Sequence, residues 1–273
     1  MNRIDQRFRA RRESGRKLLI PYIVAGDPSP GETVALMHEL AAAGADVIEL
    51  GVPFSDPMAD GPVIQQACER ALVHDVTLRD VFGMVAEFRK GDDETPVVLM
   101  GYLNPIEILG YETAAELAAE AGVDGLLTVD LPPEEGELLV PELEKRGLDA
   151  IWLIAPTTRA ERIRQICDLA HGFVYYVSLK GVTGASTLDV DDVAAHVEAI
   201  RAATELPVGV GFGISDGESA ARVSEVADAV VVGSAIVRRI GENAGDAAAM
   251  RQAVTELLRS MRRAIDAAAP ATA

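Results

Sequence analysis

The stretch "AAGADVIELG" at residues 42–51 contains the unit from which the fold can be inferred. An alanine-rich helical segment ends, a glycine follows, and an apolar strand begins. The same order returns in "EAGVDG" at 120–125 and in "KRGLDA" at 145–150. Glycine in this place is a common C-terminal stop of a helix. The repetition predicts a chain built from successive helix–strand units.

Short apolar segments alternate with longer amphipathic ones along the whole chain. Each apolar segment is rich in Val, Ile or Leu, which is typical of parallel strands buried on both faces. The predicted strands are residues 18–26, 46–51, 96–102, 124–130, 149–155, 173–178, 206–212 and 228–234. The predicted helices between and after them are residues 31–45, 61–75, 77–90, 114–122, 134–147, 159–172, 190–204, 217–227 and 247–267.

Eight strand–helix units predict an α/β fold of the (β/α)8 type, a TIM barrel. An N-terminal helix in residues 1–17 and a second helix after strand two would be additions to the basic pattern. The alternative is an open doubly wound sheet, whose first strand should run into GxGxxG. The chain has "AGDPSPGE" there instead. We expect a single domain over residues 1–273, with a frayed tail at 268–273.

The composition is strongly acidic. Asp and Glu number 43 against 25 Lys and Arg, a formal charge of -18, which makes nucleic acid and anionic membranes poor partners. Only four of the basic residues are lysine, a pattern that resembles proteins from a high-salt cytoplasm and suggests a halophilic source. The one basic run, at 3–17, spaces Ile4 and Phe8 by four, which predicts an amphipathic helix with a solvated polar face.

The two cysteines, Cys68 and Cys167, form no CxxC motif, which indicates a reducing, cytoplasmic compartment. Cys167 and His171 have the spacing of one helical turn, but two further ligands are not in sight, so no metal site is expected. No signal peptide is recognisable, and "LLIPYIVAG" at 18–26 is too short to span a bilayer. The sequence therefore predicts a cytoplasmic protein.

Three acids occur in "IELGVPFSDPMADGP" at 48–62, namely Glu49, Asp56 and Asp60. Catalytic groups of this fold lie at the carboxyl ends of strands and in the loops that follow. Val47 and Glu49 share one strand face, so Glu49 can point into the barrel mouth and act as a general acid and base. Alternatively, Glu49 pairs with a basic residue or turns outward, Asp60 caps a helix, and Asp56 in "SDP" only forms a turn.

Glycine-containing loops follow the last three predicted strands. Gly184 lies in "GVTG" after strand six, Gly213 follows strand seven, and Gly233 and Ser234 follow strand eight. Glycines let backbone N–H groups approach a ligand, and helix N-termini favour anions. The alternative is a set of ordinary turn glycines, with Asp216 as a helix N-cap. Three such loops at the usual phosphate site of this fold predict a phosphate-bearing small molecule.

These motifs resemble the tryptophan synthase alpha chain family. "IELGVPFSDPMADGP" reads as the signature of that family without a visible departure. The resemblance runs from about residue 21 to residue 237, because further motifs follow in the expected order: "PYIVAGDP", "MGYLNPI", "GVDGLLTVDLP", "GVTGA", "VGVGFGIS" and "VVGSAIV". The first motif is long and specific, whereas the glycine motifs also occur in other phosphate-binding barrels.

The resemblance implies retro-aldol cleavage of indole-3-glycerol phosphate to indole and glyceraldehyde 3-phosphate. Glu49 would deliver a proton to C3 of the indole ring and remove one from the side-chain hydroxyl. Asp60 would bind the ring N–H and stabilise the positive charge that builds there. The reaction would need neither a metal nor an organic cofactor.

The resemblance also implies roles for the residues around the two acids. Tyr175 would help to position Glu49, and Thr183 would close over the site and contact Asp60. Lys180, in the same loop, departs from the small or neutral residue expected there. The phosphate would bind to backbone N–H groups of Gly184, Gly213, Gly233 and Ser234, and the indole would lie among Tyr22, Met100, Leu127 and Phe212.

Members of the family act with a beta chain, which holds pyridoxal phosphate and receives indole through a tunnel. An alpha2-beta2 tetramer is therefore expected, with loops 53–60 and 179–188 shared between the active site and the interface. Pro53, Asp56 and Asn104 would contact the partner. A lid that closes only when the partner is ready would prevent loss of indole.

Two other functions fit the fold. One is another phosphate-binding barrel enzyme, such as an isomerase or synthase of the same pathway. Such an enzyme would require a lysine or cysteine at a strand end near the acids, and none is apparent. A non-catalytic subunit could bind ligand only to regulate its partner. The presence of both Glu49 and Asp60 argues against that function.

Overall fold

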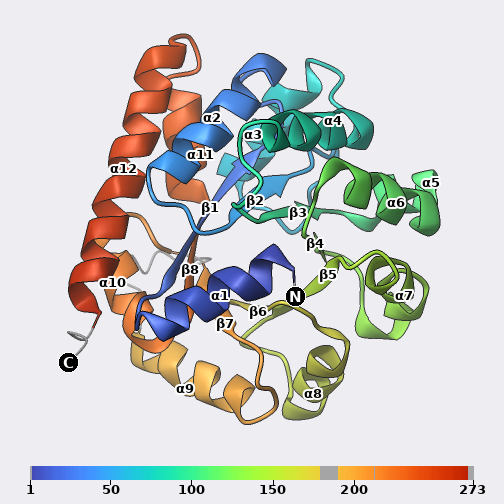
Figure 1. Ribbon diagram of the computed structural model, residues 1–273, viewed down its shortest axis with the longest axis vertical. Helices are drawn as coiled ribbons and strands as arrows, with labels where there is room; N and C mark the ends of the chain where they lie inside the picture. Colours follow the sequence, from blue (N-terminus) through green and yellow to red (C-terminus); the bar gives the residue numbers. More distant parts are fainter. Residues whose placement is uncertain (1, 179–189, 212, 270–273) are drawn as a thin grey trace.

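Eight parallel strands close into a barrel, with β8 paired to β1 (Figure 1). The computed structural model describes residues 2–178, 190–211 and 213–269. The predicted fold class is therefore confirmed. The strands are β1 (Leu18–Val24), β2 (Ile48–Gly51), β3 (Val97–Gly101), β4 (Gly125–Thr128), β5 (Asp149–Ile154), β6 (Val174–Val177), β7 (Val208–Gly211) and β8 (Ala229–Val232).

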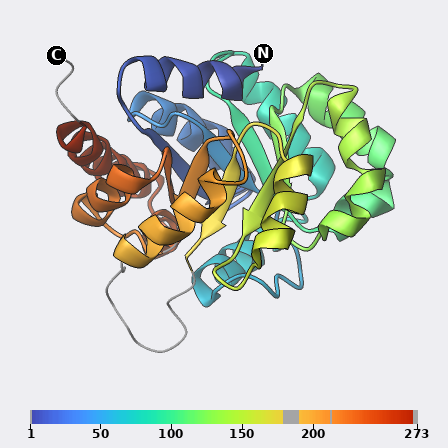
Figure 2. The same cartoon turned by 90° about the horizontal axis from the view of Figure 1, so that it is seen from below.

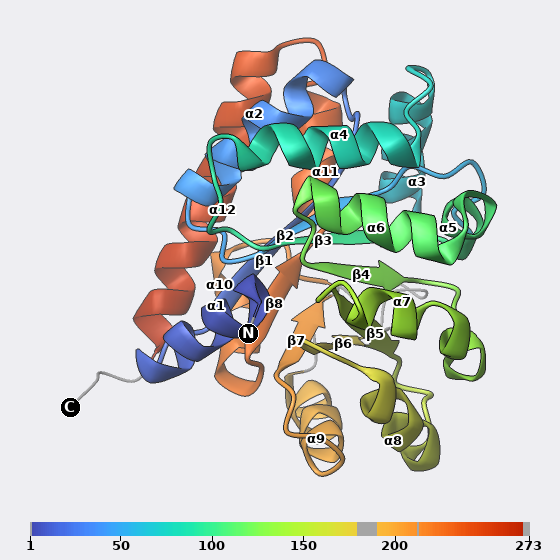
Figure 3. The same ribbon diagram turned by 45° about the vertical axis from the view of Figure 1, so that its right-hand side comes forward.

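Helices surround this barrel, as the turned view in Figure 3 shows for α4 and α6 beside β3 and for α8 and α9 on the opposite side. Both predicted additions are present, because α1 precedes the first strand and both α3 and α4 follow β2. The helices are α1 (Arg3–Glu13), α2 (Pro30–Ala42), α3 (Pro62–Leu72), α4 (Leu78–Arg89), α5 (Leu103–Leu109), α6 (Tyr111–Ala121), the 3₁₀ helix η1 (Pro133–Leu138), α7 (Val140–Glu144), α8 (Ala160–Leu169), α9 (Val190–Arg201), α10 (Gly217–Val226), α11 (Ser234–Glu242) and α12 (Ala247–Ala268).

Alternate residues of each strand pack into two different cores. Ile48 and Leu50 of β2 belong to the core between the strands and the outer helices, together with residues such as Leu36 and Phe88. Val47 belongs instead to the core inside the barrel. Because side chains alternate along a strand, Glu49 shares the inward face with Val47.

Helix α1 closes the amino-terminal end of the barrel, as Figure 2 shows at the top of the view. Its buried residues Ile4 and Phe8 join the inner core, and the Phe8 ring lies 5.5 Å from that of Phe173. The amphipathic pattern seen in the sequence is therefore confirmed. The helix is shorter than the expected 1–17, since it ends at Glu13 and Gly15 takes a φ of +66°.

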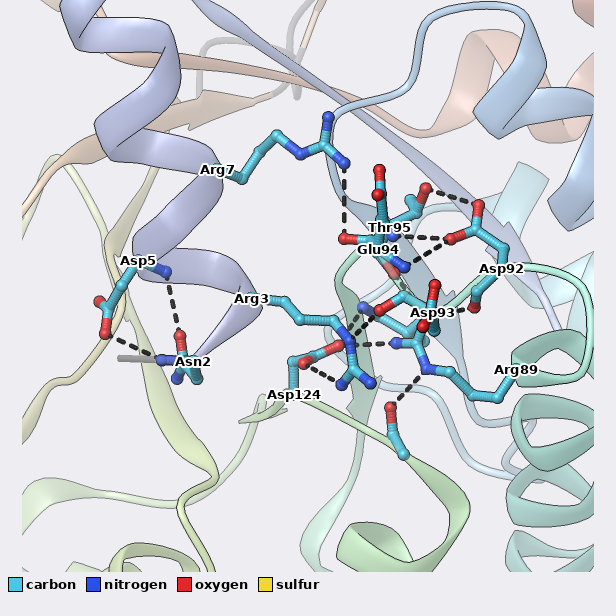
Figure 4. A network of polar contacts seen from close by, with 12 residues as sticks. Asn2, Arg3, Asp5, Arg7, Arg89, Asp92, Asp93, Glu94, Thr95 and Asp124 are labelled. Carbon is cyan, nitrogen blue, oxygen red and sulfur yellow. Dashed lines mark hydrogen bonds and ion pairs between the residues drawn. The ribbon is translucent and has the colours of Figure 1, made fainter.

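The polar face of α1 is not simply solvated, and that expectation is wrong. Arg3 Nη1 lies 3.0 Å from Asp124 Oδ1, and Arg11 Nε donates to Asp46 Oδ1 at 2.6 Å. Both aspartates are buried. Figure 4 shows Arg3 extending from α1 to Asp124. The same carboxylate also pairs with Arg89, whose Nη2 lies 2.7 Å from Asp124 Oδ2. Buried carboxylates need such partners, so the basic residues pair where the sequence suggested only solvation.

The aspartates at the helix–strand junctions also hold neighbouring strands in register. Asp46 accepts from the backbone N–H of Leu19 in β1 at 2.9 Å, and Asp124 accepts from that of Val97 in β3 at 2.8 Å. Before β8, Asp228 accepts from Val208 of β7 at 3.0 Å. At these three junctions the aspartate thus supplies an acceptor for a backbone donor at the start of the preceding strand.

Some elements of the structure differ from those predicted from the sequence. The expected helix 134–147 is divided into η1 and α7, because Pro141 lacks the N–H that a continuous helix would need. No helix was predicted between the strand at 96–102 and the helix at 114–122, yet α5 spans Leu103–Leu109. Pro105 is compatible with this start because it occupies the first turn. The expected frayed tail falls largely on residues 270–273, which lie outside the described ranges.

Candidate active site

Glu49 lies near the carboxyl end of β2, with its side chain in the barrel interior. It is 3% exposed, and in the strand register it lies opposite Tyr22 of β1 and Val98 of β3. Burial, followed by the charge of nearby Asp60, raises the pKa of Glu49 to about 8. A carboxyl group with this pKa is mostly protonated at neutral pH and can deliver a proton.

Asp60 lies in the loop between β2 and α3, close enough to Glu49 for their charges to interact. Desolvation raises its pKa, while a hydrogen bond from Tyr102 opposes that rise. The Tyr102 hydroxyl donates to Asp60 Oδ2 at 2.8 Å, and Gln65 Nε2 donates to the Asp60 backbone carbonyl at 2.8 Å. The two acids therefore lie near each other at the barrel mouth, although ten residues separate them in the sequence.

Two tyrosines flank the acids, and each lies against a strand glycine. A Cβ at Gly51 would come within 2.3 Å of the Tyr22 hydroxyl, and one at Gly211 within 2.2 Å of the Tyr175 hydroxyl. Desolvation, followed by the charges of Glu49 and Asp60, holds the pKa of Tyr175 well above its ordinary value. Tyr22 and Tyr175 thus border the two carboxyl groups from opposite sides of the barrel.

Apolar side chains cover the barrel below and beside the acids. Met100 packs against the inner core and also against the cluster that contains Tyr22, and Leu127 is buried within the inner core. Val129 and Leu153 pack on the same core from positions nearer the carboxyl ends of their strands. Neither residue was predicted from the sequence, although the period of two along the strand from Leu127 points to Val129.

Helix α11 presents its N-terminus at the carboxyl end of β8. Gly233 occupies the N-cap position and has no side-chain cap bond, and Ser234, the first helical residue, is exposed. By contrast, Asp216 caps α10 by accepting from Ser219 N at 2.8 Å, so the N-cap alternative is confirmed for this residue. Gly213 has a φ of +76° and is exposed just before α10. Of the two helix N-termini, that of α11 is the one open to an anion.

Four residues singled out in the sequence, Lys180, Thr183, Gly184 and Phe212, lie outside the described residues. Pro53, expected at a partner interface, is buried, whereas Asp56 and Asn104 are exposed. In the same region, Met58 is 86% and Ile108 is 82% exposed. The exposed residues are better placed than Pro53 to meet a partner.

Tyr102, within the motif "MGYLNPI", is a polar residue of the site that was not predicted from the sequence. It follows β3, is 4% exposed, and contacts the loop that carries Asp60. A tyrosine directly after a barrel strand is a signal that could have placed it at the site.

The comparison with known proteins agrees with this geometry. A family model described as Tryptophan synthase alpha chain matches residues 8–266. The chain belongs to the tryptophan synthase alpha chain family. A relative of that name from Thioalkalivibrio sulfidiphilus is 68% identical over 97% of this chain and 100% of its own length.

Solved structures of tryptophan synthase alpha chains have the same fold. The alpha subunit from Legionella pneumophila superposes with a TM-score of 0.92 at 50% identity, over 98% of this chain and 99% of its own. A chain of Mycobacterium tuberculosis tryptophan synthase, in an aminoacrylate-bound form, gives 0.87 at 32% identity, over 97% of this chain and 100% of its own.

As a tryptophan synthase alpha chain, the protein is a carbon–carbon lyase that cleaves indole-3-glycerol phosphate to indole and glyceraldehyde 3-phosphate. Within the described ranges, no three His, Cys, Asp or Glu side chains are grouped so as to hold a metal ion. In the same ranges, none of the helices has the length and apolarity needed to cross a bilayer.

Proposed function

We propose that Glu49 is the general acid and base of the cleavage and that Asp60 stabilises charge on the indole nitrogen. The observation that carries the proposal is a buried carboxyl group with a pKa of about 8, beside a second carboxyl group at the mouth of the barrel. Like charges in a desolvated site push the pKa values of two acids apart, which assigns one to proton donation and the other to charge stabilisation.

The proposed reaction begins with protonated Glu49. Its proton goes to C3 of the indole ring, and the carboxylate then takes the proton of the side-chain hydroxyl as the carbon–carbon bond breaks. The electron pair of that bond returns to the ring, and the hydroxyl carbon becomes the aldehyde of glyceraldehyde 3-phosphate. Protonation of C3 makes the ring nitrogen positive, and ionised Asp60 accepts a hydrogen bond from its N–H.

The two ends of the substrate find suitable surroundings on either side of the acids. The open N-terminus of α11, with Gly233 and Ser234, favours the phosphate, and we place Gly213 and Gly184 beside it. Tyr22, Met100 and Leu127 offer apolar surface for the indole, with Phe212 added from the family resemblance. Tyr175 is proposed to position Glu49, and Thr183 to contact Asp60 on closure.

We further propose that the chain acts with a beta chain in an alpha2-beta2 complex. Exposed Met58 and Ile108, near Asp56 and Asn104, are apolar side chains that a partner would cover. Pyridoxal phosphate would belong to that partner, because the cleavage itself needs only proton transfers that two carboxyl groups can perform. We also propose that the protein is cytoplasmic, as is typical of enzymes of amino-acid biosynthesis. Its acidic composition supports a cytoplasm with a high salt concentration.

The decisive experiment measures indole formation from indole-3-glycerol phosphate by the purified chain, with and without a beta chain. Glu49→Gln keeps the size of the side chain and removes its acidic proton, so kcat should fall at least ~100-fold. Exposed Glu120 on α6 offers the matched control, and Glu120→Gln should leave kcat unchanged.

The possible outcomes are separable. A wild-type chain that forms no indole even with the beta chain would contradict the lyase mechanism. A Glu49→Gln variant that keeps most of its rate would show instead that another group transfers the protons.

A further inference from the structure

We propose that Tyr102 is a positioning residue for the cleavage, which holds Asp60 in the orientation that receives the indole N–H. The inference rests on the role of Asp60 proposed above. It follows from three contacts that Tyr102 makes with one loop, between β2 and α3.

The hydroxyl of Tyr102 has a defined direction. The backbone N–H of Ala59 donates to it at 3.0 Å, and the hydroxyl in turn donates to Asp60 Oδ2 at 2.8 Å. Since the hydroxyl oxygen of Tyr102 accepts the N–H of Ala59, its own proton is free to point to the Asp60 carboxylate. One carboxylate oxygen is thereby engaged, and among the described residues no hydrogen bond is made to Oδ1, which is the oxygen proposed to receive the ligand.

The ring of Tyr102 is held as firmly as its hydroxyl. It is almost fully buried and stacks on Phe54, with ring centroids 5.1 Å apart and an interplanar angle of 26°. Phe54 and Ala59 come from the two ends of the loop segment that precedes Asp60, while residues 55, 56, 58 and 59 are exposed. Tyr102 therefore anchors an otherwise solvent-facing segment to the end of β3.

The hydrogen bond also changes the charge state of Asp60. Desolvation raises the pKa of Asp60, and the bond from Tyr102 lowers it toward the ionised form. Removing the hydroxyl should therefore raise that pKa. The other titratable groups whose charges interact with Asp60 are Glu49 of β2, Tyr22 of β1, Tyr175 of β6 and Cys68 of α3.

The test compares Tyr102→Phe with the wild type over a range of pH. The variant keeps the stacked ring and loses both hydrogen bonds. We expect kcat to fall about tenfold, the usual effect of losing a hydrogen bond to a charged group. KM should change much less, because the positive charge on the indole ring that Asp60 stabilises develops only in the transition state. We also expect the acidic limb of the kcat/KM profile to move to higher pH, since Asp60 must be ionised.

A matched control is available at Tyr176. Its ring is fully buried in the outer core, and its hydroxyl has no hydrogen-bond partner among the described residues. Tyr176→Phe should therefore leave kcat, KM and the pH profile unchanged. Phe54→Leu gives a second route, because it loosens the ring and keeps the hydroxyl, and it should move the acidic limb in the same direction by less.

Asp60→Asn separates the two proposals. If this variant keeps its activity, the role proposed for Asp60 is wrong, whatever Tyr102 does. If it loses activity while Tyr102→Phe and Phe54→Leu both keep the wild-type pH profile, only the inference about Tyr102 is overturned. The double variant Asp60→Asn/Tyr102→Phe should be no slower than Asp60→Asn alone, because Tyr102 acts through Asp60.

Discussion

Three acids within a dozen residues differ in what surrounds them. Glu49 is enclosed by the barrel, and burial raises its pKa to about 8. Asp60 is half-buried and receives a hydrogen bond from Tyr102. Asp56 is exposed and accepts from the neighbouring Ser55 hydroxyl at 2.6 Å. Position along one strand and its loop therefore places the three carboxyl groups in a buried, a half-buried and an exposed environment, which matches the different roles proposed for them.

Glu49→Gln should stabilise the protein at alkaline pH. Below the unfolded pKa of 4.5, both states hold the Glu49 proton. Between that pH and about 8, the unfolded chain releases it and the folded chain keeps it, so wild-type stability falls as pH rises. At about pH 9 the variant should exceed the wild type by a few kcal/mol in free energy of unfolding, because each pKa unit corresponds to about 1.4 kcal/mol.

Urea denaturation of both proteins at about pH 5 and about pH 9 checks this expectation, with Glu120→Gln as the exposed control. The difference between variant and wild type should grow with pH. A difference that stays constant would mean that Glu49 is not protonated in the folded state at neutral pH.

At the scale of elements, α1 joins the amino-terminal ends of several strands through charged contacts. Arg11 reaches Asp46, which is fully buried and also receives Arg262 at 2.9 Å. Lys17, just after the helix, lies 3.7 Å from Asp228. Buried ion pairs are costly to break singly, because the remaining charge stays buried without its partner.

Arg11→Met should lower the free energy of unfolding by about 1–3 kcal/mol. The loss is smaller than if Asp46 had no partner at all, because Arg262 still pairs with it. Methionine keeps most of the apolar stem, so the effect reports the charge. Arg9 on the same helix supplies the control, since its pair with Glu13 is exposed and Arg9→Met should have almost no effect.

The measurement is chemical denaturation of both variants, together with kcat. The site lies at the opposite end of the barrel, so kcat should stay at the wild-type value in each. Equal stability of the two variants would show that the contact of α1 with Asp46 contributes little.

At the scale of the whole molecule, the formal charge of -18 sets the response to salt. Excess negative charge repels itself in the compact state, and added salt screens that repulsion. Between about 0.05 and 1 M NaCl, we expect the free energy of unfolding to rise by about 1 kcal/mol, or about 2–4 °C in Tm.

Thermal unfolding measured over this range of NaCl concentrations checks the expected rise in Tm. Repeating it at about pH 5 serves as the control, because fewer carboxylates are ionised there and the gain should shrink. Stability that does not rise with salt at neutral pH would contradict the high-salt hypothesis.

The order of the eight strands and most of their helices could be predicted from the sequence alone, because buried parallel strands are continuously apolar and helices end at recognisable glycines. The sequence also placed Glu49, Gly233 and Ser234 at strand ends, where this fold holds its chemistry. The break in the predicted helix 134–147 at Pro141 and the helix α5 around Pro105 were not predicted, since local propensity does not say whether a proline occupies a first turn.

Which distant side chains contact one another became clear only from the folded barrel. The bond from Tyr102 to Asp60, the closeness of Tyr175 to Gly211, and the contacts of Arg3 and Arg11 with buried aspartates depend on how the barrel closes. Burial then sets the charge state of Glu49. Desolvation depends on every neighbour in space, so no local stretch of sequence contains it.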